Sequence, residues 1–308
     1  MDVILKQQPR KLPYSWESNM KIEEERTVMK EYQYFYVGEG EGQYIYDSTY
    51  ADYVSHPNGD YILRIVPSEI REPVTSIRNG FRVQFNGRRL RNKIPWEIPT
   101  RITTLTDIRL QQQIRSEDNP LGIMTMDDAN IDDRWAYFNR IFQQDMLYYF
   151  KNRRSNLRLR YLDNITVSQL DVRGAEHSAK RAGSLRYRGS FVGKLNLESE
   201  FVSEYTFRKS AFNNLRNRDI RSYRLDNTFS YAWDIVHLYE CELKSSYDKN
   251  RGVNGIKSFL IGIRNNYERK VQNKGRWKTF IEFDRVAVTP KGSPIPWEMS
   301  SGKKEGTT

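Results

Sequence analysis

The residues best suited to chemistry are sparse in this sequence, and their spacing matches no catalytic motif. The three histidines, His56, His177 and His237, lie in neither an HExxH motif nor a nucleophile elbow. We expect His56 and His177 in loops and His237 on the apolar side of a strand, where packing is a commoner role than ligation. Cys241 falls on that same side, which favours a buried, inert thiol. The sequence therefore predicts a noncatalytic protein.

Three glycines with the spacing GxGxG, at positions 38, 40 and 42, resemble part of a nucleotide-binding loop. Dinucleotide-binding folds use GxGxxG before a helix, and P-loops add a Lys-Ser/Thr pair. Neither feature is present here, so we interpret the glycines as a structural turn, where a backbone must adopt positive φ. We expect no small-molecule cofactor.

Acidic residues crowd one segment between positions 116 and 133, and carboxylate oxygens at that density are possible calcium ligands. The residues are Asp127, Asp128, Asp132 and Asp133. The glycine-centred spacing of a calcium loop is missing, which favours a solvated or extracellular loop over a metal site. The single cysteine also excludes an internal disulfide and a four-cysteine zinc site.

The strongest pattern is a long alternation of apolar and polar residues in two runs, 185–208 and 217–247, broken at Asn227, Val236, His237 and Leu238. A period of two indicates β-strands, because successive side chains of a strand point to opposite faces. The predicted lipid-facing or core-facing set, extended by the next strand, is Leu185, Tyr187, Phe191, Leu195, Leu197, Phe201, Tyr205, Phe207, Tyr223, Leu225, Phe229, Tyr231, Trp233, Ile235, Tyr239, Leu243, Phe259, Ile261 and Ile263. The predicted polar face comprises Arg158, Arg160, Arg186, Arg188, Glu198, Glu200, Arg224, Asp226, Glu240, Glu242 and Lys244.

Each run is too long for one ordinary strand, since it would extend for at least roughly 70 Å at about 3.3 Å per residue. One interpretation is a hairpin in each run, with turns around residues 192–194 and 232–234. The other is a pair of unusually long strands that cross a membrane and continue beyond it. Both interpretations give an antiparallel sheet with one apolar and one charged face.

The remaining chain divides into segments of different character. Residues 1–33 are expected to be an irregular or partly helical lead, with 21–30 the best helix candidate on propensity. Residues 34–70 form a small Gly/Tyr-rich β module, in which Asn58-Gly59 suits a type I′ hairpin turn. Strands and the acidic loop occupy 73–134, an antiparallel meander or barrel wall occupies 135–288, and an irregular tail occupies 289–308. About ten strands are expected in all.

Composition narrows the class of protein. Of 308 residues, 38% are hydrophobic and 13% aromatic, and the net charge is +11. Aromatic residues at this level argue against disorder, and the basic balance suits anionic partners. There is no apolar run of about 18 residues and no apolar signal-peptide core after Met1.

Three architectures can carry such strands: a membrane barrel, a soluble sandwich, or a nucleic-acid-binding sheet. Alternating short and long connections, abundant aromatic residues and strands of about 12 residues favour the barrel. The fold prediction is therefore all-β, with long amphipathic antiparallel strands in a meander. It is outer-membrane-barrel-like, complete or incomplete, with a small N-terminal β module.

Five segments carry a resemblance to a known group of proteins. They are Leu157-Arg-Leu-Arg-Tyr, Leu185-Arg-Tyr-Arg, Leu195-Asn-Leu-Glu-Ser-Glu-Phe, and Tyr36-Val-Gly-Glu-Gly-Glu-Gly-Gln-Tyr with Gly59-Asp-Tyr-Ile. In style of repetition they resemble the C-terminal region of large, mostly uncharacterised outer-membrane proteins of Gram-negative bacteria. The resemblance implies a cell-envelope location and no catalytic residues. Such barrels usually close on a strand that ends in an aromatic residue, whereas this sequence ends Gly306-Thr307-Thr308. We therefore expect a fragment of a longer protein.

Three hypotheses for function follow from these features. The first is a noncatalytic barrel-type protein of the outer membrane, serving transport, secretion or anchoring, with membrane lipid or lipopolysaccharide as partner and other envelope proteins as further partners. The second is a soluble surface or periplasmic β-sandwich that binds a partner. The third is nucleic-acid binding through basic faces, which the interleaved acidic residues weaken.

Overall fold

The computed structural model describes residues 1–9, 12–48, 52–91, 95–115, 135–151, 154–171, 174–191, 194–211, 217–234, 236–251, 255–271, 275–290 and 299. Within these ranges it contains 14 strands, two short 3₁₀ turns and no α-helix. The strands are β1 (Asp2–Gln7), β2 (Tyr14–Tyr36), β3 (Gly42–Asp47), β4 (Asp52–Gly59), β5 (Tyr61–Asn86), β6 (Ile102–Ile114), β7 (Trp135–Tyr149), β8 (Ser155–Ser168), β9 (Glu176–Phe191), β10 (Leu195–Ser210), β11 (Arg218–Ala232), β12 (His237–Asn250), β13 (Lys257–Val271) and β14 (Gly275–Thr289). The 3₁₀ turns are η1 (Gly87–Leu90) and η2 (Pro99–Arg101), which form the proline-marked connection between β5 and β6.

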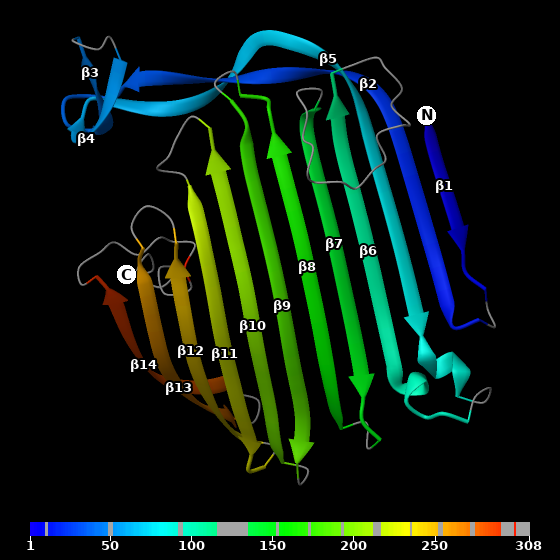
Figure 1. Ribbon diagram of the computed structural model, residues 1–308. Helices are drawn as coiled ribbons and strands as arrows, with labels where there is room; N and C mark the ends of the chain where they lie inside the picture. Colours follow the sequence, from blue (N-terminus) through cyan, green and yellow to red (C-terminus); the bar gives the residue numbers. More distant parts are fainter. Residues whose placement is uncertain are drawn as a thin grey trace.

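All of these strands belong to one antiparallel sheet (Figure 1). The pairing order is β1-β2-β5-β6 and then sequential to β14, with the β3–β4 hairpin off this path. The described sheet is open, since β1 and β14 are its two edges. The prediction of an all-β meander resembling an incomplete barrel is confirmed. The expected strand number of about ten was too low.

The N-terminal segment is the main correction to the predicted secondary structure. Residues 2–7 and 14–33 are strand, not an irregular or helical lead, because they belong to β1 and β2. The helix candidate at 21–30 lies inside β2, where Lys21 pairs with Arg78 and Glu23 with Ser76 of β5. Helix propensity is a weak prior, and here pairing with the long β5 strand overrides it.

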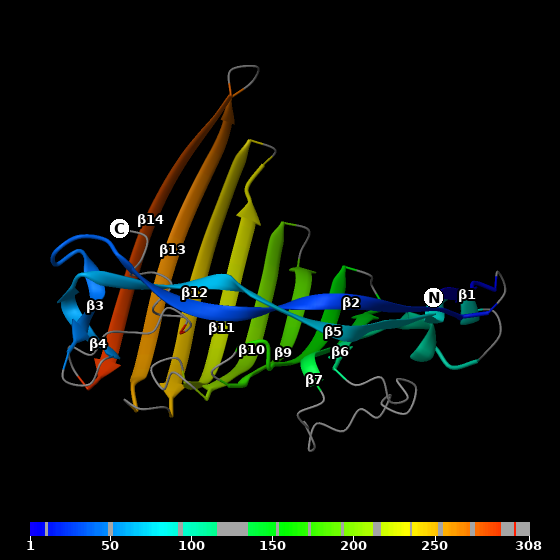
Figure 2. The ribbon, with the colours of Figure 1, turned by 90° about the horizontal axis from the view of Figure 1, so that it is seen from above.

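The C-terminal part of β2 and the N-terminal part of β5 form an arm with the β3–β4 hairpin. A register shift between Val28 and Lys30 marks where β2 bends, and Met29 is buried there. Beyond the bend, the N–H of Lys30 donates to the carbonyl of Leu170 at 2.7 Å, which ties the arm to the connection after β8. Figures 1 and 2 show the arm running across the upper ends of the sheet strands, rather than parallel to them.

Tyrosines hold the tip of the arm together, and the glycines shape its turns. Tyr34 stacks on Tyr53 with ring centroids 3.9 Å apart. Gly38 and Gly40 have φ of 127° and 75°, which confirms the structural turn predicted for the glycine triplet. The predicted Asn58-Gly59 hairpin turn is wrong, because β4 continues to Gly59 and pairs with β3 rather than with β5.

The two long alternating runs are hairpins. The first becomes β9 and β10 and the second becomes β11 and β12, with each pair antiparallel over nearly its whole length. The turn after β11 is organised by Asp234, whose carboxylate accepts the N–H groups of Val236 at 2.8 Å and His237 at 2.7 Å. The hairpin interpretation is therefore confirmed, and the single-strand interpretation is wrong.

We expect the β11–β12 turn to loosen at low pH. The N–H groups of His237 and Val236 hold the pKa of the Asp234 carboxyl below its ordinary value. A lowered pKa means that the turn is favoured above the unfolded-state pKa of about 3.9 and loses this contribution as the pH falls through the folded-state value. Asp234→Ala should expose the Val236 and His237 amides to hydrogen exchange at every pH. Asp234→Asn keeps an accepting oxygen, so its protection should not vary with pH; a wild-type pH dependence in this variant would contradict the assignment.

Two small apolar clusters lie at the upper ends of the strands, as oriented in Figure 1. The first consists of Leu110, Phe138, Ile165 and Val167, with Trp135 and Ala179 packed against them. The second consists of Ile220, Ile256 and Met299, with Val288 packed against them. The centre of the sheet is a single layer, so much of its apolar surface is not covered by the described residues.

Candidate functional site: the two faces of the sheet

One face of the sheet collects the predicted apolar residues of β9 to β13. Residues paired directly across two strands lie on the same face, and the register pairs Leu185 with Phe201, Phe201 with Leu225, and Leu243 with Ile263. Alternation within each strand then places the rest of the set on this apolar face, with the exception of Trp233 and Ile235. Trp233 lies in the bend after β11, with its ring 6.1 Å from that of Tyr231. Ile235 lies outside the described residues.

Two rows of aromatic rings cross the apolar face on β11, β12 and β13. The lower row consists of Tyr231, Tyr239 and Tyr267, each paired directly with the next. The upper row consists of Tyr223, Tyr247 and Phe259, again paired directly. The rows are separated by eight residues on all three strands, about 26 Å along a strand.

Most side chains between these rows are aliphatic or aromatic, although Asn227, Ser245 and Asn265 also lie in this zone. Leu243 and Ile263, midway between the rows, are 40% and 37% exposed, and Ile261 and Phe229 are exposed to a similar or greater extent. The apolar surface extends onto β8 through Leu159 and Tyr161. Contiguous exposed apolar surface of this extent marks a membrane or protein contact in natural proteins.

The opposite face is polar and carries the predicted charged set. The register pairs Arg160 with Asp145, Arg188 with Glu198, and Asp226 with Lys244. Strand alternation places the rest of that set on the same polar face, namely Arg158, Arg186, Glu200, Arg224, Glu240 and Glu242.

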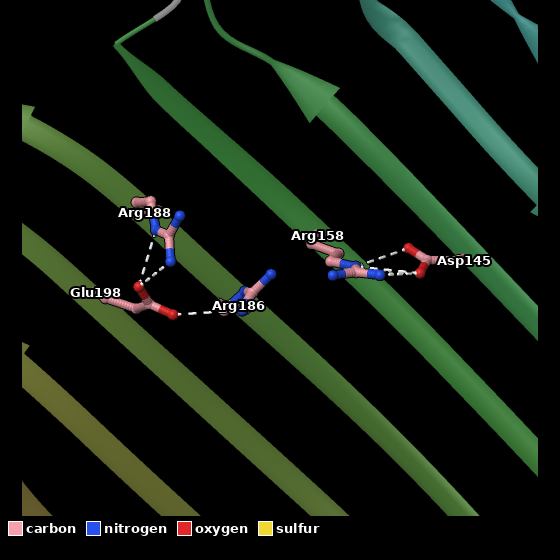
Figure 3. Close-up of polar contacts among 5 residues, drawn as sticks. All are labelled: Asp145, Arg158, Arg186, Arg188 and Glu198. Atoms are coloured by element: carbon pink, nitrogen blue, oxygen red, sulfur yellow. Dashed lines mark hydrogen bonds and ion pairs between the residues drawn. The ribbon is translucent and has the colours of Figure 1, made fainter.

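Carboxylates on the polar face bind arginines of the neighbouring strand (Figure 3). Asp145 accepts the Nε of Arg158 at 2.9 Å and lies 3.5 Å from an Nη of Arg160. Glu198 accepts the Nε of Arg188 at 2.8 Å and an Nη of Arg186 at 3.4 Å. Arg158 and Arg186 are direct cross-strand partners, so these acids offset a like-charge repulsion.

A hollow of about 700 Å³ interrupts the polar face near β1. Its lining includes Lys21, Arg78, Arg82, Asp107 and Arg109. Asp107 binds Arg82 at 2.7 Å and Arg109 at 2.8 Å, which repeats the acid-between-two-arginines arrangement found on β7 and β8. The hollow is therefore lined by paired charges of both signs.

Charged groups also occur on the apolar face, beyond the upper aromatic row and at the edge. Asp163 binds Arg140 at 3.1 Å and Arg181 at 3.0 Å, and its side chain is 12% exposed. Arg285 on β14 pairs with Ile261, within the apolar zone. Strand β14 also places Phe280 on the polar face, so its alternation is less regular than that of β9 to β13.

The histidines and the cysteine are placed singly. His56 and His177 lie on strands β4 and β9, not in the predicted loops, since β4 runs through His56 and β9 begins at Glu176. His237 lies on the apolar face as predicted, with its Nδ1 2.6 Å from the Tyr267 hydroxyl. Cys241 is a free, half-buried thiol on that face.

No group of three or more metal-binding side chains is close enough to hold a metal ion within the described ranges. The acidic positions Asp127, Asp128, Asp132 and Asp133 lie outside those ranges. The preference for a solvated loop over a calcium site therefore stays a prediction. No helix in the described part of the chain is long and apolar enough to cross a membrane.

The alignment of the aromatic rows was not predicted from the sequence. Each strand of the three carries its own pair of aromatic residues eight positions apart, and this spacing is visible in the sequence: Tyr223 and Tyr231, Tyr239 and Tyr247, Phe259 and Tyr267. The rows become visible only once the register is known.

Comparison with known proteins finds no matching family model, no similar curated protein and no similar solved structure. The class of protein must therefore be inferred from the sheet itself, an open antiparallel sheet with one exposed apolar face and one ion-paired face.

Proposed function

We propose that this chain forms part of the wall of a noncatalytic outer-membrane β-barrel in the cell envelope of a Gram-negative bacterium, serving transport, secretion or anchoring. In this proposal the apolar face contacts lipid and the polar face lines a wet interior. Lipid or lipopolysaccharide is then the main partner, and other envelope proteins are further partners.

The observation that carries the proposal is the pair of aromatic rows with a mainly apolar zone between them, in which Asn227, Ser245 and Asn265 are the polar members. Membrane barrels present an apolar band about 25 Å tall, flanked by girdles of aromatic residues at both interfaces. The rows on β11 to β13 lie about 26 Å apart along the strands, and strand tilt reduces this height somewhat. Tyr231, Tyr239 and Tyr267 supply one girdle, and Tyr223, Tyr247 and Phe259 supply the other.

The ion pairs on the other face fit a water-filled interior. Asp145 and Glu198 each engage two arginines whose side chains remain partly exposed. Such pairs tolerate water and would be unfavourable against lipid, where an uncompensated charge costs several kcal/mol. The polar face is therefore assigned to the lumen side.

The sandwich and nucleic-acid hypotheses receive less support. A sandwich needs a second sheet on the apolar face, and all the described strands belong to the one sheet. Nucleic-acid binding needs arginines available to phosphates, and Arg158, Arg186 and Arg188 each contact a carboxylate.

The proposal is tested by folding the full chain into phosphatidylcholine vesicles and digesting it with proteinase K. Insertion predicts that the β8–β14 region resists cleavage in vesicles and that urea-unfolded chain mixed with the same vesicles is digested completely. A chain that stays monomeric without detergent and does not associate with the vesicles would refute the proposal.

A further inference from the structure

We propose that a row of basic side chains on the apolar face binds the phosphate headgroups of anionic membrane lipids; this inference rests on the membrane location proposed above. The basic row consists of Arg181, Arg221, Lys249 and Lys257. Arg221 pairs directly with Lys249, and Lys249 with Lys257. Tyr205 pairs with both Arg181 and Arg221, which continues the row onto β9.

The position of the basic row relative to the aromatic row determines what it can reach. Arg221, Lys249 and Lys257 each lie two residues beyond a member of the upper aromatic row on the same strand and the same face. Two residues correspond to about 7 Å along a strand. Tyrosine and tryptophan rings mark the headgroup level of a membrane, so side chains just beyond them lie among the lipid phosphates.

The charges of the row are largely available. Arg221 and Lys257 are exposed, and Lys249 is half-buried. Arg181 forms an ion pair with Asp163, yet its side chain is 51% exposed. Among the described residues, the other acid near the row on this face is Asp219, two residues beyond Arg221. The four basic groups of the row, together with Arg140 on Asp163, therefore face two carboxylates. The ring of Tyr205 lies under the Arg221 guanidinium at 5.6 Å.

The row spans a lipid-sized surface. Arg181 lies on β9 and Lys257 on β13, four strand spacings apart, or about 19 Å at about 4.8 Å per spacing. That width accommodates two or three headgroups side by side. Phosphate suits the row because arginine binds it with two parallel N–H donors and lysine binds it as a point charge.

In the described part of the chain, the lower end of the same face has no comparable row of basic side chains, and Lys194 there donates to the Trp233 carbonyl at 3.0 Å. Beyond the lower aromatic row, the strand positions on this face hold His237 and its partner Arg269, with Trp233 and Trp277 close to the tyrosines. The two ends therefore differ in charge, which assigns the anionic lipids to the leaflet at the upper end.

The test measures lipid retention by the full chain purified in mixed micelles of neutral detergent, phosphatidylcholine and phosphatidylglycerol. Wild-type protein should retain phosphatidylglycerol preferentially, and the preference should decrease at high salt. In R221Q/K249Q/K257Q the preference should fall by up to about a hundredfold, since each of the three basic residues contributes about fivefold near an anionic surface. The matched control R64Q/R71Q/K270Q removes three exposed basic residues outside the row and should keep the wild-type preference.

Each alternative outcome is distinct. A triple variant that still folds and retains phosphatidylglycerol like wild type would overturn the inference. Loss in both triple variants would show a general charge effect, which also overturns it. Displacement of the lipid by inorganic phosphate at an equal phosphate concentration would assign the row to free phosphate instead of lipid. If wild type inserts into phosphatidylcholine vesicles but shows no anionic preference, the lipid site fails while the barrel proposal stands; if it does not insert at all, both fail.

Discussion

Replacing Leu243 by Arg should lower the free energy of unfolding in phosphatidylcholine vesicles by about 2–4 kcal/mol, the cost of a charge at the midplane of a membrane barrel's lipid face. Leu243 lies midway between the aromatic rows, four residues from Tyr239 and four from Tyr247, and it is 40% exposed. Because it pairs directly with Ile263, L243R/I263R would add repulsion between like charges. Guanidinium titration followed by tryptophan fluorescence measures the change.

Thr279 provides the control for depth. It pairs with Tyr267, which places it in line with the lower aromatic row at the level of the interface. Thr279→Arg should lower the free energy of unfolding by only about 0–1 kcal/mol. A loss at Leu243 no larger than the loss at Thr279 would mean that the apolar face does not contact lipid.

Phe138→Ala should lower the free energy of unfolding by about 3–5 kcal/mol, the range for a large aromatic residue removed from a packed interior. Phe138 is 4% exposed and packs with Leu110, Ile165 and Val167, with the Trp135 ring 5.0 Å away. The loss combines the transfer of the ring to water in the unfolded state with the cavity left behind. Urea titration in detergent micelles gives the change from the unfolding midpoint.

Phe280→Ala is the matched control for that prediction. Phe280 is 62% exposed on the edge strand β14, so its removal leaves no cavity, and the change should stay within about 0.5 kcal/mol. An equal loss in the two variants would show that Phe138 does not belong to a packed core.

The sequence was sufficient to predict the strands and faces of β9 to β13, because alternation at period two reports directly which side of a strand a residue occupies. It was insufficient for β2. The segment from Lys21 to Lys30 is rich in Glu, Lys and Arg, and its apolar residues Ile22, Val28 and Met29 are too few to outweigh helix propensity. Its pairing with the distant strand β5, from Lys21 with Arg78 to Lys30 with Pro67, makes it a strand.

The candidate site was likewise predictable only in part from the sequence. Individual polar and apolar residues could be assigned to faces from parity, whereas the aromatic rows and the basic row depend on register between strands. Tyr223, Tyr247 and Phe259 form a row because β11, β12 and β13 pair at one particular offset, and shifting one strand by two residues would break it.

The open edges of the sheet also bear on the membrane proposal. Twelve strands alternate in direction along the pairing path, so β1 and β14 run antiparallel to each other. In hydrocarbon every backbone N–H and C=O needs a partner. In a membrane wall built from this sheet, β1 and β14 must therefore be paired, either with each other as antiparallel strands or with further strands.

The single native cysteine offers the most direct measurement of which face meets lipid. A nitroxide attached to Cys241, on the apolar face between the aromatic rows, is compared in vesicles with one at position 242 in C241S/E242C. The account predicts high oxygen and low nickel-chelate accessibility at Cys241, and the reverse at position 242. Equal access of the nickel chelate to both labels, or a Cys241 label shielded from oxygen as well, would contradict it.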